Sequence, residues 1–413
     1  MRNKIFYLII CVLGNKIECM VTLKKFPVPL SRKPPITIRS VHKLPHTSKN
    51  NRLQRKYEII GRYLELDYIK WRKKLDAIKN ISPENKHFIR NELNMYQHLP
   101  LNSEKSNLHK WLSFIFDLPW DQSSSKKKMP SIAQMRLLAN KEYFGLEPVK
   151  NKFFEMHAVQ KLGGKNVGIL CLNGPPGTGK TSIAKACAQW MGKKSYSISL
   201  SGARDETYIF GHRSTYVGAM PGQPLRAMQS MQENDGVLIL DEIDKCNAQM
   251  GGISPVYAAL LALLDPKQNH AFKDHYAETS FDFSRCTFIA TANTTESIPK
   301  PLLNRLEVIE ISGYTKDEKH IIGKSYIIPK IAQQSGLNKI LTKPFISDNV
   351  LKYIIDHYID EAGNRQLEQL LRRIANNIAL HYVEFGQIKL PVIQEIKKIL
   401  GIPQIKNLHE YIM

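Results

Sequence analysis

The first regular pattern of apolar positions lies between residues 52 and 81. Its members recur every three or four positions, as on one face of an α-helix: Ile60, Leu64, Tyr68, Trp71, Leu75 and Ile78. Ser82 and Pro83 are then typical of a helix N-cap with proline in the first turn, and they predict a second helix over residues 84–98. Apolar residues on one helical face predict a third helix: Leu108, Trp111, Leu112, Ile115 and Phe116.

Continuous apolar runs farther along the chain predict buried strands. Such runs occupy residues 167–172, 236–240 and 286–291, and a shorter strand is predicted over residues 308–311. From Thr315 onward the pattern is helical. One of these helices follows the segment EAGNR and contains Leu367, Leu370, Leu371 and Ile374. The pattern therefore predicts an α/β domain with helical segments before and after it.

A glycine-rich loop follows the first predicted strand and precedes a helical pattern. It fits the phosphate-binding pattern G-x-x-x-x-G-K-[ST] without a mismatch: Gly174, Pro175, Pro176, Gly177, Thr178, Gly179, Lys180 and Thr181. In this context the glycines let backbone N–H groups surround a polyphosphate, and the N-terminus of the next helix faces the anion. We expect Lys180 to reach the β and γ phosphates of ATP and Thr181 to hold Mg²⁺.

Polar residues end the next two long apolar runs. Asp241 and Glu242 form an acidic pair that is costly at the end of a buried strand unless it has chemistry to do. Beside a phosphate loop, Asp241 would bind Mg²⁺ through water, and Glu242 would act as the general base for the attacking water. Asn293 would orient that water and contact the γ phosphate. The predicted cofactors are therefore ATP and Mg²⁺.

Positive charge is concentrated at the N-terminus. The 413 residues carry a net charge of +22, and residues 1–57 supply +12 of it with 13 Lys or Arg and one acid, Glu18. Residues 20–57 contain no acid, and such a basic segment is typical of a mitochondrial transit segment or a disordered tail. We expect such a tail over residues 1–51 and a location in the mitochondrial matrix, with the cytoplasm or nucleus as the alternative. Met20 is an alternative start.

Composition narrows the remaining classes of function. No apolar stretch has the length of a membrane span, so no membrane association is expected. The six cysteines show neither a C-x-x-C pair nor metal-ligand spacing, which favours reduced cysteines in the core. Nucleic-acid binding is supported only by charge and ranks last among the hypotheses.

Several longer segments identify a family resemblance. They are ISLSGARDETYIFGHRSTYVGAMPG (198–222), LLDPKQNHAFKDHY (263–276), FIATANTTESIPKPLLNRLEVIEISGYTKDEK (288–319) and DEAGNRQLEQ (360–369), with LPWDQ (118–122) and YFGLEPVK (143–150) upstream. From about residue 55 to residue 405 the chain resembles the AAA+ module of Lon proteases. The resemblance implies an AAA+ P-loop NTPase with a parallel sheet. The implied parts are a helical neck (52–124), a large α/β domain (125–312), a small helical lid (313–405) and a short tail (406–413).

The resemblance implies roles for four further residues. Arg305 is similar to the arginine finger that reaches the ATP of the neighbouring subunit. Arg365 is similar to the sensor arginine of the lid, which acts on ATP in its own subunit. Tyr216 and Val217 are similar to the pore loop that grips substrate polypeptide, where an aromatic ring can hold varied sequences by surface contact.

Three features depart from the pattern of the family. Asn304 stands where the family usually has aspartate, which would alter how Arg305 is held. Phe144 replaces a common tyrosine near the adenine. The second pore-loop region, residues 246–255, is longer than usual and lacks the usual charged pair, so its grip on substrate is in doubt.

The resemblance implies an ATP hydrolase that unfolds, translocates or remodels polypeptides in protein quality control. Its expected partners are unfolded polypeptides. The chain is expected to form a homo-hexamer or to assemble together with full-length Lon subunits. The family's N-terminal substrate domain and C-terminal protease domain are expected to be missing. After Ser347 the sequence has no Ser, Thr or Cys, and it has no G-x-S-x-G elbow, so serine peptidase activity is expected to be absent. The alternatives are a regulatory or scaffold subunit of Lon rings and a truncated product of an ordinary Lon protease.

Overall fold

The computed structural model describes residues 11–13, 16–18, 48–124, 129–164, 168–216, 218–246 and 254–401, with side chains from residue 63 onward. The chain divides into two compact units, residues 1–60 and 61–413. In the first unit, β1 (Cys11–Leu13) and β2 (Lys16–Glu18) pair in antiparallel fashion. Most of the expected basic tail, including Met20, lies outside the described residues.

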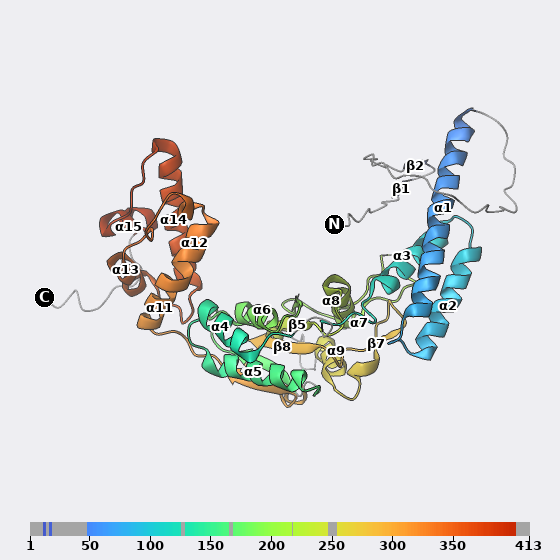
Figure 1. Ribbon diagram of the computed structural model, residues 1–413, viewed down its shortest axis with the longest axis horizontal. Coiled ribbons are helices and arrows are strands. Elements are labelled where there is room, and N and C mark those ends of the chain that lie inside the picture. The colour runs from blue at the N-terminus through green and yellow to red at the C-terminus, as the bar shows by residue number, and fades with distance from the viewer. Residues whose placement is uncertain are drawn as a thin grey trace. The chain divides into compact units, whose positions relative to one another are not determined.

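Three helices build the predicted neck. They are α1 (Ser48–Ala77), α2 (Pro83–His98) and α3 (Ser103–Asp117), shown in Figure 1. The predicted apolar seam is buried at Tyr68, Trp71 and Leu75 of α1 and at Ile78, directly after the helix. These side chains share one apolar core with Ile89 and Leu93 of α2 and Leu112 and Ile115 of α3.

The ends of the neck helices follow from local capping. Ser82 caps α2 as predicted, because its hydroxyl accepts the backbone N–H of Asn85 at 3.1 Å. The prediction of helix as far as residue 81 was wrong, since α1 ends at Ala77. The backbone N–H groups of Lys79 and Asn80 donate instead to the carboxylate of Asp121, at 2.9 and 2.8 Å, and leave the helical pattern there.

Five parallel strands form the central sheet, in the order β4-β5-β8-β3-β9. Their bounds are β3 (Ile169–Asn173), β4 (Ser195–Ser199), β5 (Val237–Asp241), β8 (Thr287–Ala292) and β9 (Leu306–Glu310). Strands β3 and β8 are buried along their whole length, which agrees with their continuous apolar sequences. The predicted α/β fold with a parallel sheet is confirmed.

Helices cover both faces of the sheet. They are α4 (Ile132–Glu142), α5 (Glu147–Lys161), α6 (Lys180–Trp190), α7 (Thr207–Phe210), α8 (Gln223–Met231), α9 (Pro255–Leu264) and α10 (Lys300–Leu303). Successive strand residues point to opposite faces, so Leu170 and Ile239 pack with α4–α6, while Cys171 and Leu240 pack with α8, α9 and the neck. Short elements complete the domain: the 3₁₀ turns Ile243–Lys245 and Asn269–Ala271, and the pair β6 (Phe272–Lys273) and β7 (Ser280–Phe281).

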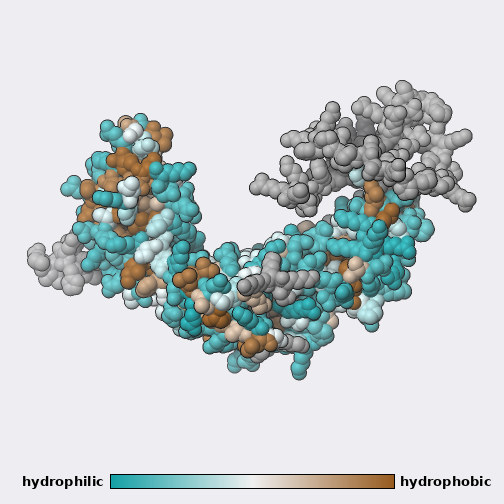
Figure 2. Space-filling model, viewed as in Figure 1, coloured by the Kyte–Doolittle hydropathy of each residue, from teal (hydrophilic) through white to brown (hydrophobic). Residues whose placement is uncertain are grey.

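The C-terminal helices form a small domain with its own core. They are α11 (Lys316–Ile322), α12 (Ile328–Gln334), α13 (Asp348–Tyr358), α14 (Arg365–Phe385) and α15 (Ile393–Leu400), with a π-helical turn at Gly323–Ile327 and a 3₁₀ turn at Leu337–Lys339. The predicted helix is α14, and its Leu367, Leu371 and Ile374 are buried in this core. Figure 2 shows apolar surface on these helices, to which the exposed Val383 and Phe385 contribute. Within the described residues, no helix is both long and apolar enough to cross a membrane. The domain boundaries inferred from the sequence stay predictions.

Candidate active site

The glycine-rich loop lies at the carboxyl ends of three neighbouring strands. Strand β3 leads into the loop and α6 follows it, while β5 and β8 end in Asp241 and Ala292 beside it. A cavity of about 920 Å³ opens at this edge, where ligands bind in open α/β sheets. The predicted residues that line it are Pro176, Gly177, Thr178, Gly179, Lys180, Thr181, Asp241, Glu242, Asn293 and Arg365. Gly174 and Pro175 take part through their carbonyl groups.

Backbone geometry shapes the loop for close approach of a ligand. Gly177 and Gly179 have positive φ angles of 80° and 90°, which side-chain-bearing residues rarely adopt. A Cβ atom on Gly177 would lie 3.2 Å from the Cβ of Arg365, so the loop also passes closely under the start of α14. Because Lys180 begins α6, the positive end of that helix faces the loop, and the arrangement fits a polyphosphate.

The Lys180 ammonium group is buried at the base of the loop, with 8% of the residue exposed. It donates to the carbonyl oxygens of Gly174 (2.6 Å) and Pro175 (2.8 Å) and to the amide oxygen of Asn293 (3.0 Å). Burial lowers the pKa of Lys180, and the carboxylates of Asp244 and Asp241 partly oppose this. All three ammonium protons thus have partners, and contact with a phosphate must replace some of these bonds.

A hydroxyl–carboxylate network joins the loop helix to the two strand ends. Asp241 Oδ1 accepts hydrogen bonds from the hydroxyls of Thr181 and Thr291, each at 2.6 Å. Thr291 Oγ1 also accepts the backbone N–H of Glu242 at 3.0 Å. Mg²⁺ prefers hard oxygen ligands and usually keeps several waters beside one or two carboxylates and the substrate phosphates, so Thr181 and Asp241 fit such an ion. The described residues contain no cluster of three or more His, Cys, Asp or Glu that could hold a metal by itself.

Glu242 is held in an unusual conformation at the rim of the cavity. Its φ angle is 57°, in the left-handed region that residues with a side chain seldom occupy and that recurs at functional sites. Its Oε1 accepts a hydrogen bond from Lys245 Nζ at 2.9 Å. The Lys245 ammonium group thus competes with water for one oxygen of the Glu242 carboxylate.

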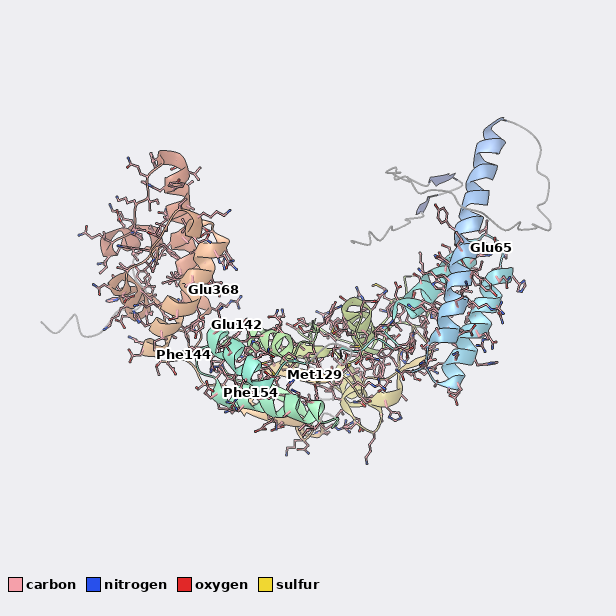
Figure 3. All side chains as sticks on the ribbon, viewed as in Figure 1. Glu65, Met129, Glu142, Phe144, Phe154 and Glu368 are labelled. Atoms are coloured by element: carbon pink, nitrogen blue, oxygen red, sulfur yellow. The ribbon has the colours of Figure 1, made fainter. Side chains whose placement is uncertain are left out.

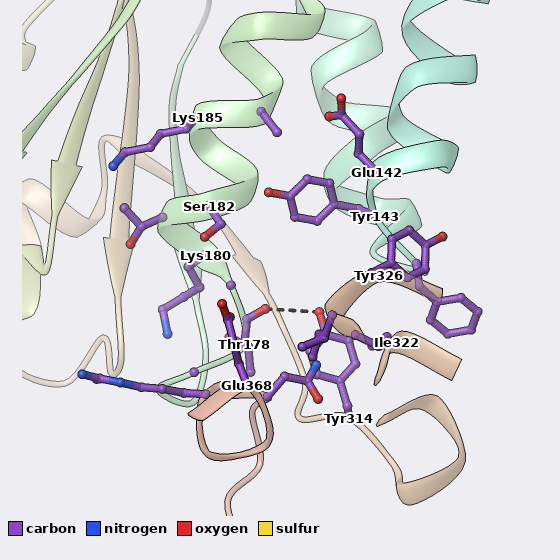
Figure 4. A pocket seen from close by; sticks show the side chains of 18 of the residues that line it. Glu142, Tyr143, Thr178, Lys180, Ser182, Lys185, Tyr314, Ile322, Tyr326 and Glu368 are labelled. Carbon is purple, nitrogen blue, oxygen red and sulfur yellow. Dashed lines mark hydrogen bonds between the residues drawn. The ribbon is translucent and has the colours of Figure 1, made fainter. Parts of the chain in front are cut away.

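The lid closes one side of the cavity with aromatic and charged side chains (Figure 4). Tyr314 donates its hydroxyl hydrogen to the carbonyl of Thr178 at 3.1 Å, and burial raises its pKa to about 12. Tyr143, Phe144 and Tyr326 add a wall of rings beside α4. Figure 3 labels three residues that line the cavity: Glu142 at the end of α4, Phe144 shortly after it, and Glu368 in α14 of the lid.

Two of the predicted functional positions lie away from the cavity. Arg305 is not among the described residues that line it. Its guanidinium donates to the carbonyl of Leu261 (2.8 Å) and to Asp265 Oδ2 (3.1 Å), so it is held from α9 and not through Asn304. Tyr216 is 64% exposed on a separate loop.

Val217, the other predicted pore-loop residue, lies outside the described residues, as do residues 247–253 of the second pore-loop region. The roles assigned to all of these residues stay predictions.

Sequence reasoning missed several residues that the fold brings to the site. Thr291 lies in β8, two positions before Asn293, which follows the strand, and a hydroxyl at that spacing was its only signal. Asp244 is 6% exposed, and its Oδ2 accepts the backbone N–H of Asn293 at 3.2 Å. Its Oδ1 is buried and has no hydrogen-bond partner among the described residues. Tyr314 and Tyr326 come from the lid, and no local pattern announces their contact with the loop.

Comparison with known proteins places two parts of the chain. Residues 170–314 match the family model described as ATPase family associated with various cellular activities (AAA), and residues 333–390 match the Lon protease AAA+ ATPase lid domain.

Two curated relatives illustrate the similarity. The chain is 42% identical over 292 residues to Lon protease 1 of Bdellovibrio bacteriovorus, covering 70% of this chain and 36% of the relative. It is 44% identical over 304 residues to a Lon protease of Methanosarcina barkeri, covering 73% of this chain and 37% of the relative. The chain thus spans little more than a third of the length of these relatives. Among solved structures, a point mutant of Thermotoga maritima RuvB aligns with a TM-score of 0.43 and 19% identity, over 63% of this chain and 72% of that chain.

Proposed function

Since the chain contains an AAA+ ATPase module of the Lon family, we propose that it hydrolyses ATP to unfold, translocate or remodel polypeptides. The observation that carries the proposal is the meeting of Lys180, Asp241, Glu242, Asn293 and Arg365 at one cavity. These residues come from three strand ends and the lid. Lys180 supplies a cation for the phosphates, Asp241 a metal ligand and Glu242 a general base, and Asn293 and Arg365 add polar contacts.

The residues of the loop bind the nucleotide phosphates. The backbone N–H groups of the loop surround the phosphates, and Lys180 turns from Gly174 and Pro175 toward the β and γ phosphates. Thr181 and Asp241 would hold Mg²⁺, which would neutralise charge on the phosphate oxygens. When Lys180 turns toward the phosphates, it also leaves the amide oxygen of Asn293. The free amide of Asn293 then orients the attacking water.

Glu242 is the general base of the proposed reaction. Its carboxylate leaves Lys245, accepts a proton from the attacking water and lets the oxygen add to the γ phosphorus as the bond to the β-phosphate oxygen breaks. The Thr291 hydroxyl keeps the backbone of Glu242 in position during this step. Arg365 contacts the phosphates from the start of α14, so hydrolysis and lid position are linked.

Arg305 supports the proposal of a ring. It lies outside the cavity of its own chain and is oriented by Asp265, so it can serve an ATP site only in a neighbouring subunit. We therefore propose a homo-hexamer, with co-assembly with complete Lon subunits as the alternative. Mixing Arg305→Ala with Glu242→Gln chains should restore part of the turnover, because some interfaces then combine an intact Arg305 with an intact Glu242. A monomer with full turnover would contradict the ring.

The function is tested by size determination and ATP turnover of the purified 413-residue chain, with and without an unfolded polypeptide. We expect turnover that rises when the polypeptide is added and that disappears in Glu242→Gln. We also propose that these residues cleave no peptide bond, so a casein-like substrate should stay intact on a gel. No turnover above the Glu242→Gln variant would refute the ATPase proposal and leave a passive scaffold.

The basic segment supports a proposal on location. Residues 1–57 carry 13 Lys or Arg and one acid, and we propose that they direct the chain to the mitochondrial matrix. A fluorescent reporter fused to residues 1–57 should then colocalise with a matrix marker. A diffuse cytoplasmic or nuclear signal would contradict this location.

A further inference from the structure

The loop that carries Tyr216 closes on a buried carboxylate. The loop runs from Gly211 to Gly222, and its two arms pair where the His212 N–H donates to the Met220 carbonyl at 2.9 Å. Asp274 lies at its base with none of its surface exposed. Asp274 Oδ2 accepts the backbone N–H of Gly222 at 2.8 Å, so the carboxylate holds one end of the loop directly.

Both ends of this loop require glycine because the carboxylate and the backbone approach too closely for a side chain. A Cβ atom on Gly222 would lie 2.0 Å from the Ile209 carbonyl oxygen and 2.9 Å from Asp274 Oδ2. A Cβ atom on Gly211, whose φ angle is 78°, would lie 2.7 Å from the Gly222 nitrogen and 2.9 Å from Asp274 Oδ1. Both arms therefore rest on Asp274.

The other carboxylate oxygen organises the turn that contains Asp274. Asp274 Oδ1 accepts the backbone N–H groups of Tyr276 (2.8 Å) and Ala277 (3.0 Å). This turn is also fixed to the neck, because the indole N–H of Trp111 donates to the Tyr276 carbonyl at 2.9 Å. The Phe114 ring also packs edge-on against the Tyr276 ring, with centroids 5.6 Å apart. Asp274 thus links a loop on the large domain to helix α3.

A second contact ties the outer part of the loop to the same turn. The Ser214 hydroxyl donates to Glu278 Oε1 at 2.5 Å, only two residues before Tyr216. Tyr216 itself makes loop-internal backbone bonds to Arg213 and Ala219, and its side chain stays exposed. The exposed Tyr216 ring therefore lies on a loop that is held at its base by Asp274 and near its tip by Glu278.

We propose that Asp274 is a positioning residue that fixes the Tyr216 loop to the neck so that the exposed ring can hold a polypeptide under load. The proposal rests on the proposed remodelling function, because a loop that pulls on a polypeptide needs a rigid base. A buried acceptor with three backbone donors supplies that base, since hydrogen bonds to a charged group are about twice as strong as neutral ones.

The substitution Asp274→Asn separates the loop from the turn. With its oxygen in the Oδ1 place, the asparagine still accepts from Tyr276 and Ala277, but its NH₂ group faces the N–H of Gly222. In the flipped orientation the NH₂ group would face the N–H groups of both Tyr276 and Ala277, instead of the single N–H of Gly222. The orientation with the oxygen in the Oδ1 place is therefore favoured. The turn is therefore kept while its bond to the loop is replaced by a repulsive contact.

The test measures the loop and the grip separately, on the full chain. Amide hydrogen exchange in a peptide that spans residues 211–222 should become at least about tenfold faster in Asp274→Asn, since one strong bond is lost. The concentration of unfolded casein that gives half-maximal stimulation of ATP turnover should rise about fivefold or more, while the KM for ATP stays within twofold of the parent. The matched control is Asp282→Asn, in the same segment, whose carboxylate accepts the N–H of Ser284 and lies 3.9 Å from Arg285 Nε, both outside residues 211–222.

The outcomes distinguish this proposal from the proposed function. Unchanged exchange, or faster exchange with unchanged stimulation by casein, would overturn the role of Asp274. If the parent chain is not stimulated by any unfolded polypeptide, the remodelling function fails, and faster exchange in Asp274→Asn would then support only the structural tie. Ser214→Ala, at a half-buried position, removes only the hydroxyl of the second tie, and it should raise the half-maximal casein concentration about twofold.

Discussion

Replacing Thr291 by valine removes one hydroxyl from the centre of the proposed catalytic site and keeps the size and branching of the side chain. Thr291 is 2% exposed, and its hydroxyl donates to Asp241 at 2.6 Å and accepts the Glu242 N–H at 3.0 Å. A hydrogen bond to a charged group contributes about 1.5–3 kcal/mol, and a buried N–H without a partner costs about 1–3 kcal/mol. Asp241 keeps its bond from Thr181, so we expect the free energy of unfolding to fall by about 3 kcal/mol.

The same change should slow ATP turnover more than it weakens ATP binding. The Thr291–Glu242 bond holds the backbone of Glu242 in its left-handed conformation, and a loss of about 1.4 kcal/mol from the transition state lowers kcat about tenfold. Urea denaturation measures the first effect, and steady-state ATP turnover measures the second. Thr291→Ser is the control, because it keeps the hydroxyl and loses only a methyl group. Turnover of Thr291→Val within twofold of Thr291→Ser would refute this account of Glu242.

Three further predictions follow from the geometry. Lys180→Ala should abolish tight ATP binding, measured with a fluorescent ATP analogue, because the loop loses its point charge at the β and γ phosphates; binding at the parent affinity would contradict this. Asp265→Asn should lower turnover of the assembled chain by about fivefold and leave ATP affinity unchanged, since Arg305 loses its charged partner at 3.1 Å; an equal loss in a chain that does not assemble would oppose it. Burial raises the pKa of Asp274 to about 6, against the effect of its three backbone N–H donors and of His275. The folded chain thus takes up this proton before the unfolded chain does, so the free energy of unfolding should fall by on the order of 3 kcal/mol as pH rises from about 4 to about 6. Asp274→Asn should lose this part of the slope in urea denaturation between pH 4.5 and 7, and an unchanged slope would argue against the raised pKa.

The parts of the site that could be predicted from sequence are those encoded by short segments and by the order of strands. Lys180 and Thr181 belong to a contiguous motif, Asp241 ends β5, and Asn293 directly follows the last residue of β8. Because the carboxyl ends of parallel strands meet at one edge of a sheet, the motif and the two strand ends were bound to converge. The core faces followed for the same reason, since alternation along a strand decides which residues meet which helices.

The remaining features depend on contacts between residues that are distant in sequence. The end of α1 is set by Asp121, more than 40 residues beyond it, and no local pattern at Lys79 and Asn80 signals that bond. In the same way, Arg305 is oriented by Asp265 across the end of α9, although the sequence drew attention to its neighbour Asn304. Local patterns describe helix faces and motifs well, but they do not say which distant side chain satisfies a given donor.

The phosphate loop and the lid meet through backbone contacts, which would couple their movements. A Cβ atom on Gly363 would lie 2.3 Å from the backbone carbon of Gly177, and the N–H of Asn364 donates to the Gly177 carbonyl at 2.9 Å. No side chain lies between the two backbones, so a ligand that draws the loop toward its phosphates must also move Gly363 and the start of α14. Arg365 is the next residue but one, and its guanidinium moves with the same segment. The loop that carries Tyr216 has a separate support, because Asp274 ties it to the turn that contacts the neck. The structure therefore contains two sets of close contacts, one between the phosphate loop and the start of α14 and one between the Tyr216 loop and the neck. Under the proposed function, the large domain would have to transmit force between them.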